Sequence, residues 1–215
     1  KKGLLPKPKT YWSLIKNAIY GKKNQLKLGV SDIQDGLEHQ LQLSIKKQMI
    51  SDVPIGAFLS GGIDSSVITA LMQSQSNRPV KTFTMGFSES DFNEAKYAKK
   101  ISKHLGTDHT ELYISSKKAM DIIEKLPSIY DEPFSDSSQI PSFLISQLAK
   151  QSVKVALSGD GGDELFGGYN RYIICNKLSN IISSVPLPFR KVLSIILQSV
   201  SPQNWTKFLK LIPHL

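Results

Sequence analysis

Seven consecutive residues in the first third of the chain could bind an anion. The run is Ser60-Gly61-Gly62-Ile63-Asp64-Ser65-Ser66, and it lies between a short apolar stretch and a stretch with helical spacing. A strand-to-helix junction directs several backbone N–H groups and the positive end of the helix at one point, and glycines let an anion come close. The run lacks the lysine of a Walker loop and the three-glycine spacing of a dinucleotide fingerprint.

The carboxylate of Asp64 changes the chemistry that we expect at this run. A carboxylate repels phosphate unless a cation lies between them, and Mg²⁺ is usually held by one or two carboxylates together with phosphate oxygens. We therefore predict a pyrophosphate site with Mg²⁺. The alternative is an ordinary strand-to-helix turn with Asp64 in the first turn of the helix.

A second glycine-rich and acidic run follows another apolar stretch, residues 153–157. It reads Ser158-Gly159-Asp160-Gly161-Gly162-Asp163-Glu164. Ligands of open parallel sheets bind beyond the carboxyl ends of the strands, so we predict that the two runs face each other across one crevice. Asp160, Asp163 and Glu164 then offer a second metal ligand and a candidate base. The alternatives are a calcium-like acidic turn, which would need more carboxylates at alternating positions, and a hydrated loop.

The elements around these runs alternate between strands and helices. Short apolar runs predict strands at 53–59, 80–87, 110–114 and 153–157, and helical spacing predicts helices at 65–73, 93–105, 117–126 and about 140–150. Strands separated by helices of this length imply a parallel sheet. The predicted fold class is therefore α/β, a parallel sheet with helices on both faces.

The two ends of the chain have a different texture. Residues 1–30 have no sustained apolar period and read as a connector, whereas Ser31 and Gln34 form a capping box at the start of a helix that we expect to end near Ser51. After Gly168 the chain becomes helical, and we expect its apolar stripes to pack against other helices rather than a membrane surface. We expect the domain to continue past Leu215.

Composition excludes several function classes. The chain has 215 residues and 40% apolar residues, and no apolar run reaches the roughly 20 residues of a membrane span, so we expect a cytoplasmic protein without a membrane partner. The net charge is +9, but ten lysines and three acidic residues lie in the first 50 residues, which favours a basic linker over a nucleic-acid groove.

The single cysteine, Cys175, excludes an internal disulfide and a thiolate zinc site. The four histidines, His39, His104, His109 and His214, have no paired spacing, and we interpret them as structural or surface residues.

Three segments together resemble one known family. The run from Ser51 to Ser66 looks like the pyrophosphate loop of the N-type ATP pyrophosphatases. With Asp131-Glu132-Pro133-Phe134 and the run from Ser158 to Tyr169, it is similar to the synthetase domain of glutamine-hydrolysing asparagine synthetases. The resemblance covers about residues 31–175. It implies an adenine nucleotide alpha hydrolase-like fold and residues 31–215 as the ATP-dependent synthetase domain.

The resemblance also implies a reaction and roles for single residues. An aspartate carboxylate would attack the α-phosphate of ATP to give β-aspartyl-AMP and pyrophosphate, and ammonia would displace AMP. Asp64 and Asp163 would hold Mg²⁺. Asp160 would lie beside the acyl-adenylate, where it would either position this intermediate or take the proton from the attacking ammonia. The remaining matched residues would contact the nucleoside (Leu59, Met85, Ser158, Gly159) or surround pyrophosphate (Ser60, Gly61, Gly62, Asp64, Ser65, Ser66).

One departure from the family limits what this chain could do. The family's glutaminase half uses an N-terminal cysteine, and none is present, so residues 1–30 would be the linker from a missing glutaminase domain and the full-length enzyme would be a candidate homodimer. Three alternatives stay open. One is an amidotransferase acting on another carboxylic acid, of the polysaccharide or β-lactam type, another is a nucleotide-binding module without turnover, and the weakest is tRNA modification.

Overall fold

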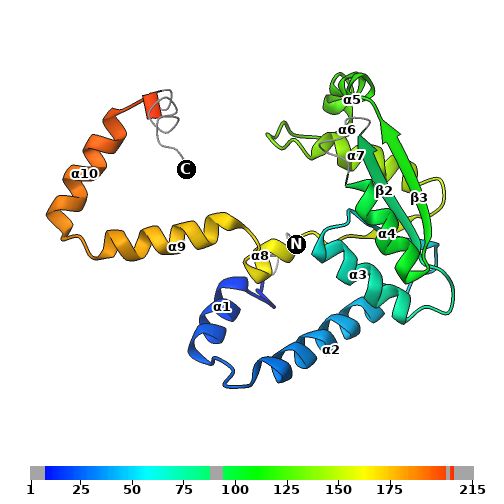
Figure 1. Cartoon of the computed structure of the whole chain (residues 1–215), viewed down its shortest axis with the longest axis horizontal. Coiled ribbons are helices and arrows are strands. Elements are labelled where there is room, and N and C mark those ends of the chain that lie inside the picture. The colour runs from blue at the N-terminus through cyan, green and yellow to red at the C-terminus, as the bar shows by residue number, and fades with distance from the viewer. Residues whose placement is uncertain (1–7, 88–93, 202–203, 206–215) are drawn as a thin grey trace, which may run out of the picture.

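The sheet of this computed structural model is parallel throughout. The structure describes residues 8–87, 94–201 and 204–205. Within them the strands are β1 (Ile55–Phe58), β2 (Lys81–Phe87), β3 (Asp108–Ile114) and β4 (Val155–Leu157). They lie in the order β3-β2-β1-β4, and each neighbouring pair is parallel. Figure 1 shows β2 and β3 side by side. The predicted fold class is confirmed.

The strand order reverses between β1 and β4. The chain steps outward from β1 through β2 to β3 and then returns to place β4 on the other side of β1, with Ala57 opposite Leu157. The loops that follow two such neighbouring strands diverge to opposite faces and leave a crevice at the carboxyl edge. The loops after β1 and β4 are the two glycine-rich runs.

Helices cover both faces of the sheet. On one face lie α2 (Val30–Gln48), α3 (Ile63–Ser74) and α4 (Ala95–Leu105), and Ile45, Ala57 and Met72 pack together there. On the other face lie α5 (Ser116–Ile123), α6 (Leu126–Ile129) and α7 (Gln139–Ala149), where Phe58 and Phe83 pack against Ala149. Successive strand residues point to opposite faces, so β1 contributes Ala57 to one layer and Phe58 to the other.

The N-terminal segment differs from the prediction. It contains a helix, α1 (Leu14–Lys23), capped by Ser13, whose Oγ accepts a hydrogen bond from the Lys16 amide at 3.4 Å. Leu14, Ile15, Ala18 and Ile19 lie on one side of this helix, but none of its residues is buried. The sequence analysis did not predict this helix, and the assignment of residues 1–30 to a linker stays a prediction.

Two predicted helix boundaries were also wrong. The capping box at Ser31 does not form because α2 already begins at Val30 with Gly29 as its N-cap, and α2 ends at Gln48. The helix predicted over 117–126 is divided into α5 and α6. Pro127, in the first turn of α6, has no N–H to donate to the carbonyl of Ile123, and its ring crowds that carbonyl, which explains why α5 ends there.

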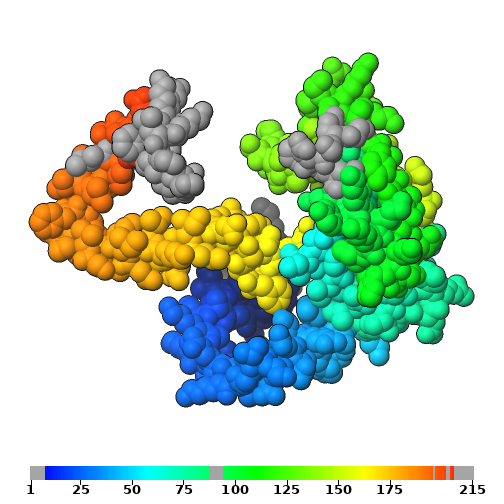
Figure 2. Space-filling view, in the orientation of Figure 1, coloured from blue at the N-terminus to red at the C-terminus, as the bar shows by residue number. Residues whose placement is uncertain are grey.

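The last helices project away from the sheet. They are α9 (Asn170–Ser183) and α10 (Leu187–Ser199). They follow α8 (Gly162–Phe166), which begins inside the second glycine-rich run and ends two residues after it. Figures 1 and 2 show α9 and α10 as an arm separated from the sheet layers by an open notch. No residue of α9 is buried, and Ile181 is 64% exposed. The expected packing of these apolar stripes is therefore absent among the described residues.

None of the helices in the described part of the chain is long and apolar enough to span a bilayer.

Candidate active site

The carboxyl edge of the sheet holds a cavity of about 1080 Å³ between the two glycine-rich loops. Its walls come from the ends of β1 and β2, the start of α3, the second loop and the start of α7. Most residues that the sequence singled out line it: Leu59, Ser60, Gly62, Asp64, Ser65, Met85, Ser158, Gly159, Asp160 and Asp163. The structure thus brings both predicted loops to one crevice, and the roles of the single residues stay predictions.

Ser65 holds the first loop in shape. Its hydroxyl accepts a hydrogen bond from the Ser60 amide at 3.2 Å and lies 2.9 Å from the Ser60 hydroxyl. It also donates to the Gly62 carbonyl at 3.3 Å, and the residue is 8% exposed. These bonds fix the strand-to-helix turn, so that the amides at the start of α3 point to the cavity edge.

The two loops touch each other at glycines. A Cβ at Gly159 would lie 2.7 Å from the Ser65 nitrogen, and a Cβ at Gly162 would lie 2.6 Å from the Asp64 Cγ. Any larger residue at either position would push the loops apart. The carboxylate of Asp64 therefore lies directly against the backbone of the second loop.

Two predicted pyrophosphate residues do not line the cavity. Gly61 has a φ of 87° and packs against α4, where its Cβ would lie 2.8 Å from the Tyr97 Cβ. Ser66 donates its hydroxyl to the Gly62 carbonyl one turn back along α3. Gly61 and Ser66 therefore stabilise the conformation of the first loop through these contacts.

The two predicted nucleoside residues on the strands are held firmly. Leu59 is 1% exposed, its amide donates to the Phe83 carbonyl at 2.9 Å, and its carbonyl accepts from the Thr84 hydroxyl. Met85 lines the cavity and also packs against the apolar layer beneath α5 and α7. Both residues can form a fixed apolar wall.

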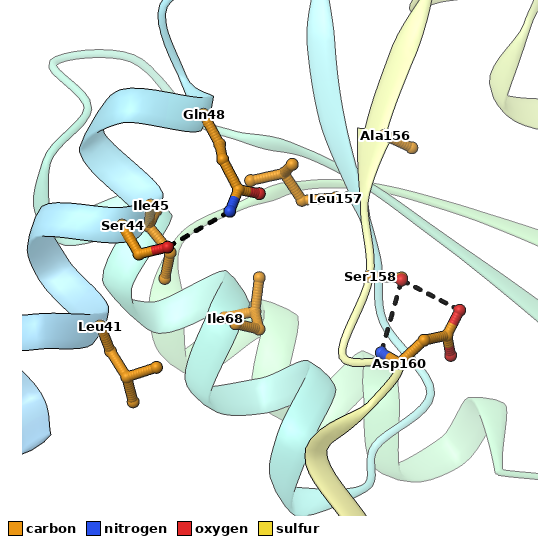
Figure 3. A pocket seen from close by; sticks show the side chains of 9 residues that line it. All are labelled: Leu41, Ser44, Ile45, Gln48, Ile68, Ala156, Leu157, Ser158 and Asp160. Atoms are coloured by element: carbon orange, nitrogen blue, oxygen red, sulfur yellow. Dashed lines mark hydrogen bonds between the residues drawn. The ribbon is translucent and has the colours of Figure 1, made fainter. Parts of the chain in front are cut away.

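Asp160 lies between two cavities. Its Oδ2 accepts a hydrogen bond from the Ser158 hydroxyl at 3.0 Å, and its amide donates to the same hydroxyl at 3.4 Å. Figure 3 shows both residues beside a smaller cavity of about 400 Å³ whose other walls come from α2, α3 and β4. This turn fixes the carboxylate at the boundary of the two spaces.

Sequence reasoning missed six polar residues that line the large cavity: Thr84, Glu94, Asp136, Ser138, Ser142 and Tyr169. Asp136 accepts a hydrogen bond from the Ser138 amide at 2.8 Å, and this bond holds the pKa of Asp136 below its usual value. The signal was available for this pair, because Asp and Ser immediately before an apolar helical run are typical of a helix start. No comparable pattern marks Glu94 or Tyr169.

Tyr169 and Glu164 form a pair at the cavity wall. The Tyr169 hydroxyl donates to the Glu164 Oε1 at 2.6 Å, and Arg171 stacks on the Tyr169 ring with its guanidinium carbon 4.1 Å from the ring centroid. The hydrogen bond lowers the pKa of Glu164 and raises the pKa of Tyr169 to about 12. At neutral pH the pair is a carboxylate and a neutral phenol.

The described residues contain no group of three or more His, Cys, Asp or Glu side chains that could hold a metal ion. Asp64 and Asp163 both line the large cavity, and Asp163 also packs against Gly168. Two carboxylates on loops in mutual contact suit a Mg²⁺ ion that takes its other ligands from phosphate and water. The residues present therefore fit the predicted ion.

A family model described as asparagine synthase matches residues 36–211. The chain belongs to the asparagine synthase family. It is 37% identical over 164 residues to asparagine synthetase [glutamine-hydrolyzing] 1 of Bacillus subtilis, which covers 76% of this chain and 25% of that protein. It is 34% identical over 151 residues to asparagine synthetase B [glutamine-hydrolyzing] of Escherichia coli, 62% of this chain and 26% of that protein.

The chain thus spans about a quarter of the length of these two asparagine synthase relatives. Among solved structures it is similar to the NH3-dependent NAD synthetase of Campylobacter jejuni, with 16% identity over 66% of this chain and 62% of that chain and a TM-score of 0.44. The asparagine synthase assignment depends on the sequence matches, and the fold class on the observed strand order.

Proposed function

We propose that this chain supplies the ATP-binding and carboxylate-activating centre of an enzyme that makes asparagine from aspartate. Membership of the asparagine synthase family supports an ATP-dependent amide ligase. The observation that carries the proposal is the contact between two glycine-rich loops at the ends of β1 and β4, which encloses a cavity with the residues expected for adenylation.

The proposed reaction has two steps. An oxygen of the aspartate side-chain carboxylate attacks the α-phosphorus of ATP, so that an acyl–phosphate bond forms while the bond to the β-phosphate breaks and pyrophosphate leaves. Ammonia then attacks the acyl carbon, AMP leaves with the oxygen that joined it, and the nitrogen loses a proton. In the complete protein, a separate glutaminase domain would release this ammonia from glutamine.

The first loop would bind the pyrophosphate end of ATP. Amides at the start of α3 and the Ser60 hydroxyl offer donors to phosphate oxygens, and Ser65 fixes their arrangement. Asp64 and Asp163 would hold Mg²⁺, which neutralises charge on the departing pyrophosphate. Leu59 and Met85 would bound the nucleoside.

The second loop would serve the acyl end. Asp160 is exposed and held by Ser158 at the boundary of both cavities, which suits a carboxylate that takes a proton from attacking ammonia. Ammonia is neutral and small, so it needs little more than a path to the acyl carbon and a base beside it.

Aspartate-dependent exchange of labelled pyrophosphate into ATP tests the proposal on the complete protein that contains this chain. Exchange with aspartate supports it. Exchange only with a different carboxylic acid would assign the protein to a related amidotransferase. ATP binding without exchange for any acid would leave a nucleotide-binding module and would contradict the proposal.

A further inference from the structure

The large cavity has a one-sided charge. Its described lining includes six carboxylates, Asp64, Glu94, Asp136, Asp160, Asp163 and Glu164, and no Lys, Arg or His. A substrate that brings only negative charge into this space meets repulsion from the protein and from ATP. A substrate that carries an ammonium group beside its carboxylates brings its own partner for one of these acids.

Glu164 is held by the side chain of a tyrosine. It lies in the first turn of α8, and Tyr169, which follows α8, fixes its Oε1 with a 2.6 Å hydrogen bond. Asp160 is tied to its own loop by Ser158, Asp136 receives the Ser138 amide, and Asp64 lies against Gly162. Ser158 and Tyr169 both line the cavity, so Asp160 and Glu164 are each held by a cavity side chain. The residue that holds Glu164 is a large aromatic side chain with further contacts to Arg171 and Tyr172.

The tyrosine is itself fixed from outside the cavity. Arg171 stacks on its ring at 4.1 Å, and Tyr172 meets the ring edge with centroids 5.5 Å apart and planes at 73°. A cation on the ring face and an aromatic edge on the same ring restrict its rotation. The Tyr169 hydroxyl therefore keeps its place beside Glu164. Arg171 contacts the ring of Tyr169, and the hydroxyl of Tyr169 contacts Glu164.

We propose that Glu164 binds the ammonium group of the amino-acid substrate and that Tyr169 is a positioning residue which holds Glu164 for this contact. This inference rests on the proposed function and names how the same cavity selects its acceptor. An ammonium–carboxylate bond gives direction as well as attraction, so it also turns the reacting carboxylate toward the α-phosphate. A dicarboxylic acid without the amino group lacks this contact.

The test compares aspartate with succinate, which is the same acid without the amino group. On the complete protein, pyrophosphate exchange gives KM for aspartate and ATP, and succinate is measured as substrate or as competitor. Calorimetric binding of both acids, in the presence of an ATP analogue with a methylene group between the α- and β-phosphorus atoms, gives the preference without turnover. The variants are Glu164→Gln, Tyr169→Phe and the matched control Tyr172→Phe. The control removes a hydroxyl from a residue that does not line the cavity and keeps the ring beside Tyr169.

We expect Glu164→Gln to raise KM for aspartate by roughly tenfold or more, the size of a hydrogen bond to a charged group, and to leave KM for ATP and the affinity for succinate unchanged. Tyr169→Phe should raise KM for aspartate by a smaller factor of about three, because it loosens Glu164 and leaves its charge in place. Tyr172→Phe should change neither KM for aspartate nor KM for ATP. Glu164→Asp, which keeps the charge on a shorter arm, should restore part of the preference.

Three results with the variants would overturn the inference while the proposed function stands. They are equal loss of aspartate and succinate affinity in Glu164→Gln, a raised KM for ATP in Tyr169→Phe, and equal behaviour of Tyr169→Phe and Tyr172→Phe. Equal binding of both acids to the unmodified protein would also overturn it. Absence of exchange with every acid contradicts the proposed function, and the two failures are thus distinguishable.

Discussion

At the scale of single residues, Asp64 and Asp160 line one cavity but have different neighbours. Asp64 lies at the start of α3 against the backbone of Gly162, where the two loops meet. Asp160 is held in a turn by Ser158 and reaches a second cavity. This difference in surroundings leads us to expect that each acts in a different step.

Asp64→Asn should abolish pyrophosphate exchange and amide formation together. The change removes the charge expected to hold Mg²⁺ at the departing pyrophosphate, and both activities should fall by about 10²-fold or more. Exchange assays and asparagine formation with supplied ammonia, on the complete protein, provide the measurement. Exchange close to that of the unmodified protein would contradict the metal role.

Asp160→Asn should separate the two activities. Aspartate-dependent exchange should stay measurable, whereas asparagine formation should fall by roughly 10²-fold, the usual size of a lost acid–base contribution. Ser158→Ala is the companion variant, because it frees the carboxylate without removing it. Equal loss of both activities in Asp160→Asn would move this residue into the adenylation step.

His109 makes the stability of the fold depend on pH. Its side chain is 7% exposed, its Nδ1 lies 2.9 Å from the Thr82 hydroxyl, and its Nε2 has no hydrogen-bond partner. Burial is the main cause that lowers the pKa of His109 below 6.5, against the opposing effect of Glu111 and together with that of Lys99. The folded state therefore holds this histidine neutral.

Because the pKa of His109 is lower in the folded chain, this histidine binds fewer protons there than in the unfolded chain. Stability should be full above about pH 6.5 and should decrease as the pH falls from there toward the folded pKa. Thermal unfolding between pH 7.5 and 5 measures this, and His109→Gln should flatten the decrease. His104→Gln, at an exposed position, is the control. If stability decreases by the same amount in both variants as the pH falls, the pH dependence belongs to groups other than His109.

At the scale of elements, the first loop is shaped by its contact with α4. Gly61 has a φ of 87° and would place a Cβ 2.8 Å from the Tyr97 Cβ, whereas Gly106, which ends α4, has a φ of 71° and open space around it. Both glycines thus have a left-handed backbone conformation, but only Gly61 has neighbours that leave no room for a Cβ.

Gly61→Ala should destabilise the chain more than Gly106→Ala. Both variants incur the cost of a left-handed backbone, about 1 kcal/mol, and Gly61→Ala adds a clash that pushes the first loop from α4. Urea unfolding gives the difference between the two, and ATP affinity should fall only for Gly61→Ala. Equal midpoints in the two variants would show that the close approach to Tyr97 costs nothing.

At the scale of the whole molecule, the helical arm presents apolar surface to solvent. Leu187 is 66% exposed, Phe189 68% and Val192 56% on α10, and Ile181 on α9 is 64% exposed. A continuous apolar surface of this kind is usually covered by another surface.

The chain of 215 residues should therefore self-associate. Light scattering over a range of concentrations should show species larger than a monomer, and the double change Ile181→Asp and Phe189→Asp should shift the population toward the monomer. Lys191→Asp, on the same arm but at a polar position, is the control. A monomer at high concentration for the unmodified chain would contradict the expectation.

The sequence by itself determined the parallel α/β class and the two loops. Short apolar runs that end in Gly-rich polar segments, followed by helical spacing, carry this information locally, because strand, turn and helix preferences depend on neighbours in the chain. The same local reasoning failed at α1 and at the capping box of Ser31, where no buried face or competing cap at Gly29 could be recognised.

Only the tertiary structure decided which residues share the cavity. The contact of Gly162 with Asp64 and the walls built by Asp136 and Glu94 join segments that are far apart in the chain, and no local period encodes them. The placement of β4 beside β1 brings the second loop to the first, because parallel strands send their carboxyl ends to one edge. The hydrogen bond from Tyr169 to Glu164 likewise depends on the path of the chain after α8, which brings Tyr169 back to Glu164. The residue types alone do not specify this path.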